Sequence, residues 1–359
     1  MPLTVIRPLS LWQELDLLCR LGLGLAPVAP DVCAALRQLG QADAAALFWL
    51  DENGLPEGFF HEDSPSSVRD LFLNEFERLF VGPHEINVFA LAQQDGPRVG
   101  RLLVPDARYF RSHTYNLLVR ASGHHHALDM RVEVPGRDGM VVRAVVLLFR
   151  ERRGDGGGIP FGTTQVEVLE RAGAHLARAF APQSTTAWDA NIDGPVGHVL
   201  LDAASQHPVL ADATALQLLQ HAQLRGLGLN HPANATALPP DLAHLLAARP
   251  GHPALIPVPE GMLHVHAHVL LPPAGGPPQR LLTLQLQRPR RIDVARRVLA
   301  LPLSPLQREI ALLAGLGHPR AECAAHTGVG HEALKKHLRT VLRAAGASDW
   351  DSLAAVLRS

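Results

Sequence analysis

Apolar and polar positions along the first half of the chain predict both helices and strands. Residues 162–180 carry apolar side chains spaced by three and four, which is typical of an amphipathic helix. Helices are also predicted at residues 11–21 and 31–39. The short apolar runs at 46–50 and 141–150 are rich in β-forming residues and predict buried strands.

A second segment, residues 196–288, has a shorter version of the same pattern. A helix is predicted in it at 213–222. Strands are predicted on either side of this helix, at 198–202, 208–212, 262–271 and 280–288. Both segments have the pattern of α+β units, in which helices pack on one sheet. The last 59 residues differ, because their pattern is almost purely helical.

Three stretches of biased composition separate these segments. A Gly-rich loop is expected at 152–160, and the polar, Pro-containing stretch 181–195 has the composition of a linker. Residues 288–297 are rich in arginine. From these breaks the sequence predicts five parts. They are a first α+β unit at 1–182, a linker at 183–195, a second α+β unit at 196–288, a linker helix at 289–300 and an all-α unit at 301–359.

Composition and charge exclude several classes of protein. The chain has 359 residues, 47% of them hydrophobic, which suits two or three domains and excludes wholesale disorder. Its formal charge of −1 excludes a protein that coats nucleic acid by bulk positive charge. The three cysteines form no CxxC pair, which excludes a disulfide framework and fits a reducing cytoplasm. No apolar run reaches about 18–20 residues, so we predict a cytoplasmic protein with no membrane partner.

The C-terminal pattern predicts a helix, a tight turn and a second helix. Ser304 and Gln307 have the spacing of a capping box at the start of one helix, which is predicted to stop near Gly317. A short helix is then predicted at 320–326. The Gly-containing turn that follows, at 327–330, leads into a third helix whose end we place at Gly346. This order is the helix-turn-helix arrangement.

The third helix is predicted to have two different faces. At about 100° per residue, five apolar side chains fall on one arc about 100° wide: Leu334, Leu338, Val341, Leu342 and Ala345. Four cations fall on another arc of about 100°: Lys335, Lys336, Arg339 and Arg343. Long basic side chains on one helix face suit the major groove of DNA, where they neutralise phosphates and contact base edges. His331 and Glu332, at the start of the helix, are also candidates for contact with base edges.

These residues resemble the helix-turn-helix domain of LuxR-type transcriptional regulators over the last 59 residues. The positions that agree in register are Leu303, Ser304, Pro305, Glu309, Gly317, Glu322, Ala324, Gly328, Val329, Lys335, His337, Leu338 and Gly346. The resemblance implies double-stranded DNA as the partner and a fourth helix at 351–359 that serves dimerisation. Four positions depart from the pattern: Pro319, Cys323, Gly330 and Ala333. Gly330 and Ala333 stand where the family has hydroxyl side chains that cap the recognition helix or contact phosphate.

The N-terminal units resemble sensory domains. Residues 115–118, the strand-like runs that follow and Pro160-Phe161 before the closing helix look like a GAF-type domain over 1–182. Residues 196–288 look like a small PAS-like domain, with Asp212 where such domains usually have asparagine. The resemblance implies a small-molecule effector, which it does not identify. We predict no cofactor.

Histidine patterns do not predict a metal site. His264, His266 and His268 share one strand face, but the outer two are about 13 Å apart along the strand, too far for one metal shell. Three consecutive histidines at 124–126 point to different sides of their strand. The pair His331-Glu332 lacks the second histidine of a zinc-protease motif. We therefore predict that the protein is neither a metalloprotein nor an enzyme.

The sequence thus predicts a one-component, homodimeric regulator in which GAF-like and PAS-like units control a LuxR-type helix-turn-helix. The alternative is a ligand- or metal-sensing protein whose helix-turn-helix serves as a protein interaction module, which the departures at Gly330 and Ala333 would suit.

Overall fold

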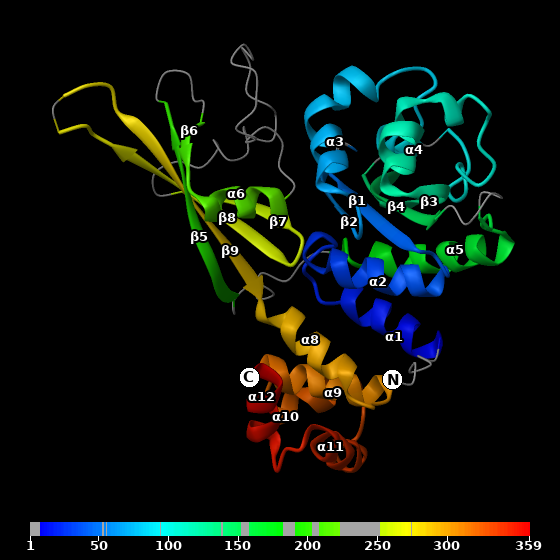
Figure 1. Cartoon of the computed structure of the whole chain (residues 1–359). Coiled ribbons are helices and arrows are strands. Elements are labelled where there is room, and N and C mark those ends of the chain that lie inside the picture. The colour runs from blue at the N-terminus through cyan, green and yellow to red at the C-terminus, as the bar shows by residue number, and fades with distance from the viewer. Residues whose placement is uncertain are drawn as a thin grey trace.

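The computed structural model contains two antiparallel sheets with helices packed on them, followed by a C-terminal run of helices (Figure 1). The described residues are 8–51, 54, 56–93, 95–137, 139–151, 158–181, 191–202, 208–222, 252–273 and 275–359. The predicted α+β class is confirmed at this level. Among the described residues, no helix has the length and apolar character needed to span a bilayer.

The first sheet has four strands in the order β2-β1-β4-β3. They are β1 (Ala44–Leu50), β2 (Pro56–His61), β3 (His124–Pro135) and β4 (Met140–Glu151). The strands predicted at 46–50 and 141–150 are confirmed as β1 and β4. All seven residues of β1 are buried, because layers of helix cover both faces of the sheet. The sequence pattern did not predict β2. This strand contains Pro56 and Gly58, two residues that form strands poorly.

Three helices cover one face of this sheet. They are α1 (Pro8–Cys19), α2 (Ala29–Leu39) and α5 (Thr163–Arg178), close to the helices predicted at 11–21, 31–39 and 162–180. Their apolar sides meet alternate residues of the strands in one core, which includes Leu15, Leu36, Leu47, Met130, Leu148 and Leu176. Alternate strand residues face the same side, so the remaining residues of β1 face the opposite layer.

The opposite layer combines one long helix with several short helical pieces. α3 (Ser66–Leu79), α4 (Val88–Ala92) and three short helical turns between Tyr109 and Ser122 cover this face. Their core is rich in aromatic side chains, including Phe48, Phe59, Tyr109, Tyr115 and Phe149. Short pieces pack less regularly than long helices, and this layer is where the cavity described below lies.

The connection between α4 and β3 is held against the sheet by a buried acid. Asp129 of β3 is 1% exposed, and one of its carboxylate oxygens accepts a 2.6 Å hydrogen bond from the Leu102 N–H. The carbonyl of the same residue accepts the N–H of Gly100 at 2.9 Å. Burial raises the pKa of Asp129 to about 6, although the hydrogen bonds and the nearby Arg101 and Arg131 oppose this.

The second sheet has five strands in the order β6-β5-β9-β8-β7. They are β5 (Asn191–Leu201), β6 (Pro208–Ala211), β7 (Ala254–Val258), β8 (Gly261–Leu270) and β9 (Gln279–Pro289). α6 (Ala213–His221) covers one face. The elements predicted at 198–202, 208–212, 213–222, 262–271 and 280–288 are all present, and β7 is an additional strand. β5 begins at Asn191, inside the stretch predicted as a linker, and linker residues 183–190 lie outside the described residues.

The predicted linker helix, α8 (Arg290–Ala300), is present but does more than connect two units. Ile292 and Ala295 are buried in the core of the first sheet and its helices, whereas Val294 and Val298 are buried in the C-terminal core. α8 therefore packs in two hydrophobic cores, one on each side of the helix. The position of α8 along the chain is visible from sequence. Its burial depends on contacts with the neighbouring α9 and also with α1, which lies at the other end of the chain.

The C-terminal unit consists of α9 (Pro305–Leu316), α10 (Arg320–Thr327), α11 (His331–Ala345) and α12 (Trp350–Arg358). Their shared core includes Leu303, Ile310, Cys323, Leu334, Leu338 and Leu353. Gly315 lets α9 approach α8 closely, because a Cβ at this position would overlap Val294 Cγ1 and crowd Leu357. The four helices occupy the predicted positions to within a residue or two.

Asp129→Asn should change how stability depends on pH. The raised pKa means that the folded state favours the protonated acid, so its stabilising contribution is complete below pH about 4 and is lost as pH rises through about 6. Asparagine keeps an oxygen for the Leu102 N–H and does not ionise. Measured by urea unfolding, the stability of Asp129→Asn relative to wild type should therefore rise by about 2 kcal/mol between pH 4 and 7.

The exposed Asp70→Asn is the matched control and should follow the wild type at every pH. A difference between Asp129→Asn and wild type that does not vary with pH would contradict the assigned role of Asp129.

Candidate nucleic-acid interface

The boundaries of the helix-turn-helix are fixed by local chemistry. The Ser304 N–H donates to Gln307 Oε1 at 3.0 Å and the Gln307 N–H donates to Ser304 Oγ at 3.5 Å, which completes the predicted capping box. Gly317, Gly328 and Gly346 end α9, α10 and α11 with φ values of 89°, 65° and 66°. This left-handed region favours glycine, so these three positions stop each helix where the sequence predicts.

α11 has the two predicted faces. Leu334, Leu338 and Val341 are buried against the other helices, while Leu342 and Ala345 are half-buried at the edge of the contact. The predicted basic side chains are all exposed: Lys335, Lys336, Arg339 and Arg343. His331 and Glu332 are exposed in the first turn of the helix. The structure therefore places all six predicted site residues outside the core of this unit.

The four cations are available for an external partner. None of them forms an ion pair or a side-chain hydrogen bond with another residue in the described part of the chain. α11 lies at the end of the molecule remote from both sheets, so neither α+β unit covers it (Figure 1). A local group of unpaired cations on a rigid helix attracts a polyanion even though the whole chain is close to neutral.

α12 holds α11 and α9 in position. The indole N–H of Trp350 donates to the His318 carbonyl at 3.0 Å, and Arg358 Nε donates to the Gly315 carbonyl at 2.8 Å. Leu353, Ala354 and Leu357 of α12 are buried. Cys323 lies in the same core, where burial raises the pKa of its thiol, so this cysteine serves as a small apolar residue there.

A network of charged side chains connects the C-terminal unit to both sheets. Arg296 of α8 donates to both carboxylate oxygens of Asp31 in α2, at 2.9–3.2 Å, and to Glu260 in the β7–β8 turn at 3.2 Å. Glu260 also accepts a bond from Arg288, and its own N–H donates to the Pro27 carbonyl. Its backbone is left-handed, with φ 64°, a strained conformation that these contacts hold in place.

α1 also contacts the C-terminal unit directly. Arg308 of α9 is 9% exposed and donates to Gln13 Oε1 at 3.3 Å. Burial lowers the pKa of Arg308, although the nearby Glu14 opposes this effect. Burial also raises the pKa of Glu14, to which Asp31 adds and which Arg308 opposes. The helix-turn-helix is thus connected to the first unit through both α8 and α9.

An apolar cavity lies in the first unit, between the sheet and the layer of short helices. Its empty volume is about 680 Å³ when the open solvent at its mouth is counted. Phe48, Phe59, Phe72, Leu91, Tyr109 and Val119 form part of its lining. The hydroxyl of Tyr109 is buried and has no hydrogen-bond partner among the described residues. Mostly apolar walls with a few polar groups are characteristic of small-molecule sites.

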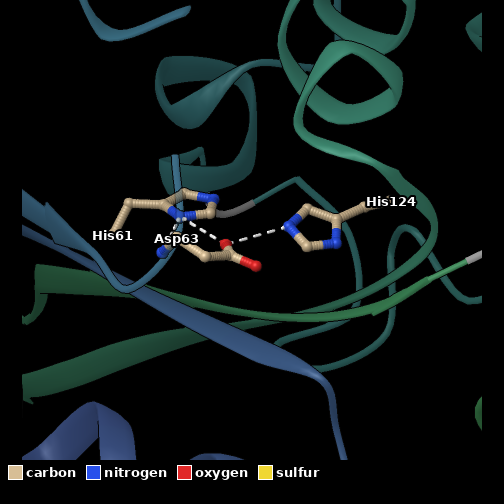
Figure 2. A group of neighbouring side chains, drawn as sticks. All are labelled: His61, Asp63 and His124. Carbon is tan, nitrogen blue, oxygen red and sulfur yellow. Dashed lines mark hydrogen bonds and ion pairs between the residues drawn. The ribbon is translucent and has the colours of Figure 1, made fainter. Parts of the chain in front are cut away.

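A cluster of three side chains next to this cavity was not predicted from the sequence. His61, Asp63 and His124 offer ligand atoms within 4.8 Å of one another (Figure 2). The sequence shows His61 and Asp63 two residues apart, and this spacing is the one local signal. His124 was considered only with its neighbours at 125 and 126, and the structure instead brings it to residues about sixty positions earlier in the chain.

Comparison with protein-family models gave no match for this chain. Comparison with curated proteins gave no match either.

Gly330→Ser should stabilise the start of α11. Gly330 is the N-cap residue of this helix and provides no side-chain cap. A serine hydroxyl can accept the N–H of Glu332 or Ala333, which a glycine leaves to solvent. Compared with Gly330→Ala, the serine variant should slow amide hydrogen exchange at residues 332–334 by about fivefold, which corresponds to the usual worth of a cap.

Alanine is the matched control because it adds a Cβ without the hydroxyl, and a Cβ at position 330 has no atom within 4 Å. Equal exchange rates in the two variants would show that the start of α11 does not need a side-chain cap.

Proposed function

We propose that this protein is a DNA-binding transcriptional regulator of the LuxR type. The observation that carries the proposal is the exposed basic face of α11, where Lys335, Lys336, Arg339 and Arg343 lie together on a helix that follows a tight turn. α11 enters the major groove in this proposal, and its cations contact phosphates and base edges. His331 and Glu332, at the start of the helix, contact bases.

The buried face of α11 supports the same proposal. Leu334, Leu338 and Val341 fix the rotation of the helix about its axis, so the cations all face away from the core. α12 shares the apolar core with α11, and the Trp350 and Arg358 hydrogen bonds join α12 to the end of α9. A recognition helix needs this rigidity, because base contacts depend on side chains held in one orientation.

The two α+β units act as the sensory region in this proposal. The first is GAF-like, and its apolar cavity with the unpaired Tyr109 hydroxyl suits a mainly apolar small molecule that carries one polar group. The second is PAS-like. Asp212, in the position where such domains usually have asparagine, caps α6 by accepting the Ala215 N–H at 2.7 Å.

The junction at Arg296 gives these units a route to the DNA-binding unit. Asp31 belongs to the first unit and Glu260 to the second, and Arg296 of the shared helix α8 binds both. A shift of either unit changes the partners of a half-buried guanidinium and so favours another position of α8. The DNA-binding unit moves with α8 because the two share a core.

We also propose that two copies bind together. One helix-turn-helix contacts a short half-site, and two copies related by a twofold axis match a palindromic operator. We also propose that the protein acts in the cytoplasm, where its DNA target lies. The proposal includes no catalytic role.

The test is binding of the purified protein to duplex fragments selected from its own sheared genome, measured by fluorescence anisotropy at several salt concentrations. Lys335→Ala with Lys336→Ala should weaken binding strongly, because the double variant removes two phosphate contacts. It should also reduce the slope of log affinity against log salt by about 1.8, at about 0.9 per contact.

Arg78→Ala with Arg108→Ala is the control, because it makes the same change in net charge at exposed positions of the first unit. This control should bind DNA as the wild type does. If no duplex binds with salt-dependent affinity, or if both double variants lose affinity equally, the proposal fails and the protein-interaction role of the helix-turn-helix is favoured.

A further inference from the structure

Three side chains at the edge of the apolar cavity have the composition of a metal site. His61 is the last residue of β2, Asp63 follows two residues later, and His124 begins β3. β2 and β3 are the two outer strands of the first sheet, so the fold brings the two histidines together from opposite edges. Figure 2 shows the Asp63 carboxylate between the two imidazole rings.

Phe149 of β4 keeps both rings in place. Its ring stacks on His124 with centroids 4.9 Å apart and on His61 with centroids 5.1 Å apart. The two imidazoles are themselves stacked at 5.8 Å. The side chain of His124 is fully buried, that of His61 is 12% exposed and that of Asp63 is 42% exposed. Stacking on Phe149 therefore fixes the two histidines, and the cluster is open to solvent on the side of Asp63.

The distances fit the coordination shell of a small cation. Asp63 Oδ1 lies 3.2 Å from His124 Nε2 and 3.3 Å from His61 Nδ1. A tetrahedral ion with bonds of about 2.0–2.1 Å holds its ligand atoms about 3.3 Å apart. The three ligand atoms lie within 4.8 Å of one another, so a small rotation of one imidazole would bring all three to bonding distance from one ion.

The hydrogen bonds of the cluster join the atoms that a cation would bind. His61 Nδ1 lies 3.4 Å from the Asp63 amide nitrogen and 3.3 Å from Asp63 Oδ1. His124 Nε2 lies 3.2 Å from the same carboxylate oxygen, which therefore stands between one nitrogen of each imidazole. A divalent ion would replace the imidazole protons in these contacts and bind the two nitrogens and the oxygen together.

His124 offers one of its two ring nitrogens to the cluster. Its Nδ1, on the side of the ring away from Asp63, is buried and has no hydrogen-bond partner among the described residues (Figure 2). Its Nε2 faces Asp63 Oδ1 at 3.2 Å, so Nε2 is the nitrogen that would bind a metal.

We propose that His61, Asp63 and His124 bind a divalent first-row transition-metal ion, of which Zn²⁺ is the representative. Two imidazoles and one carboxylate suit such ions, whereas Mg²⁺ and Ca²⁺ prefer oxygen ligands alone. Three protein ligands leave at least one coordination position for water or another ligand. The cavity is the nearest source of that ligand, because His61 and Phe149 both belong to its lining. This inference does not depend on DNA binding.

The test is a titration of the full-length, untagged, chelator-treated protein with Zn²⁺, followed by calorimetry. A parallel titration with Co²⁺ is followed by visible absorption. We expect one saturable Zn²⁺ site per chain and a Co²⁺ spectrum of nitrogen and oxygen ligands. His61→Gln and Asp63→Asn should each weaken Zn²⁺ binding by at least tenfold, about the lower end of the effect of changes in a metal site. Both variants retain polar side chains at partly exposed positions, so unchanged thermal unfolding without metal would show that they fold.

The control must exclude adventitious binding by other histidines. His266 and His268 are exposed on β8 and alternate on one face, so His266→Gln with His268→Gln removes the best competing pair. This control should bind Zn²⁺ as the wild type does. The proposal is overturned by the absence of saturable binding, by affinity that survives in His61→Gln and Asp63→Asn, or by binding lost in the His266/His268 control.

Discussion

The structure depends on α8 burying two faces at once. Ile292 and Ala295 complete the core of the first unit, and Val294 and Val298 complete the core of the helix-turn-helix. A helix of eleven residues is marginal by itself, so α8 is stabilised by these two cores. The two cores cannot move independently without exposing apolar surface on one side of this helix.

The polar side of α8 adds specificity to this arrangement. Arg296 contacts an acid from each α+β unit, and its bidentate bond with Asp31 fixes the orientation of the guanidinium as well as its distance. Ion pairs that are partly exposed contribute little free energy, so the apolar contacts hold the units together and Arg296 determines which surfaces meet. This division of roles suits a protein in which one unit has to respond to another.

The first unit combines a regular layer with an irregular one. Three helices cover one face of the sheet with a closely packed core, and α3 with several short helical pieces covers the other. The irregular layer leaves the cavity, and the ends of β2 and β3 place His61 and His124 at its edge. The cavity and the three proposed metal ligands therefore lie on the face where packing is least regular, while the opposite face stabilises the unit and joins it to α8.

Local signals in the sequence were sufficient for the C-terminal unit. The capping box at Ser304, the left-handed glycines at 317 and 346 and the apolar stripe of α11 each act within one or two helical turns. The exposure of Lys335 and its neighbours follows from that stripe, because side chains opposite a buried face point to solvent. Similar short-range patterns predicted β1 and β4, whose apolar runs are long, and β8 and β9, in which apolar and polar side chains largely alternate. They missed β2, which contains Pro56 and Gly58, and β7, which has five residues.

What the sequence determined by itself was the α+β class, the positions of most elements and the candidate DNA-contacting residues, because these depend on spacing along a single helix or strand. The tertiary structure decided three things: which strands are neighbours, that α8 packs in two cores, and that His61 and His124 come together beside Asp63. These outcomes depend on contacts between residues tens to hundreds of positions apart. Such contacts are selected by the packing of whole faces against each other, and no local pattern encodes them.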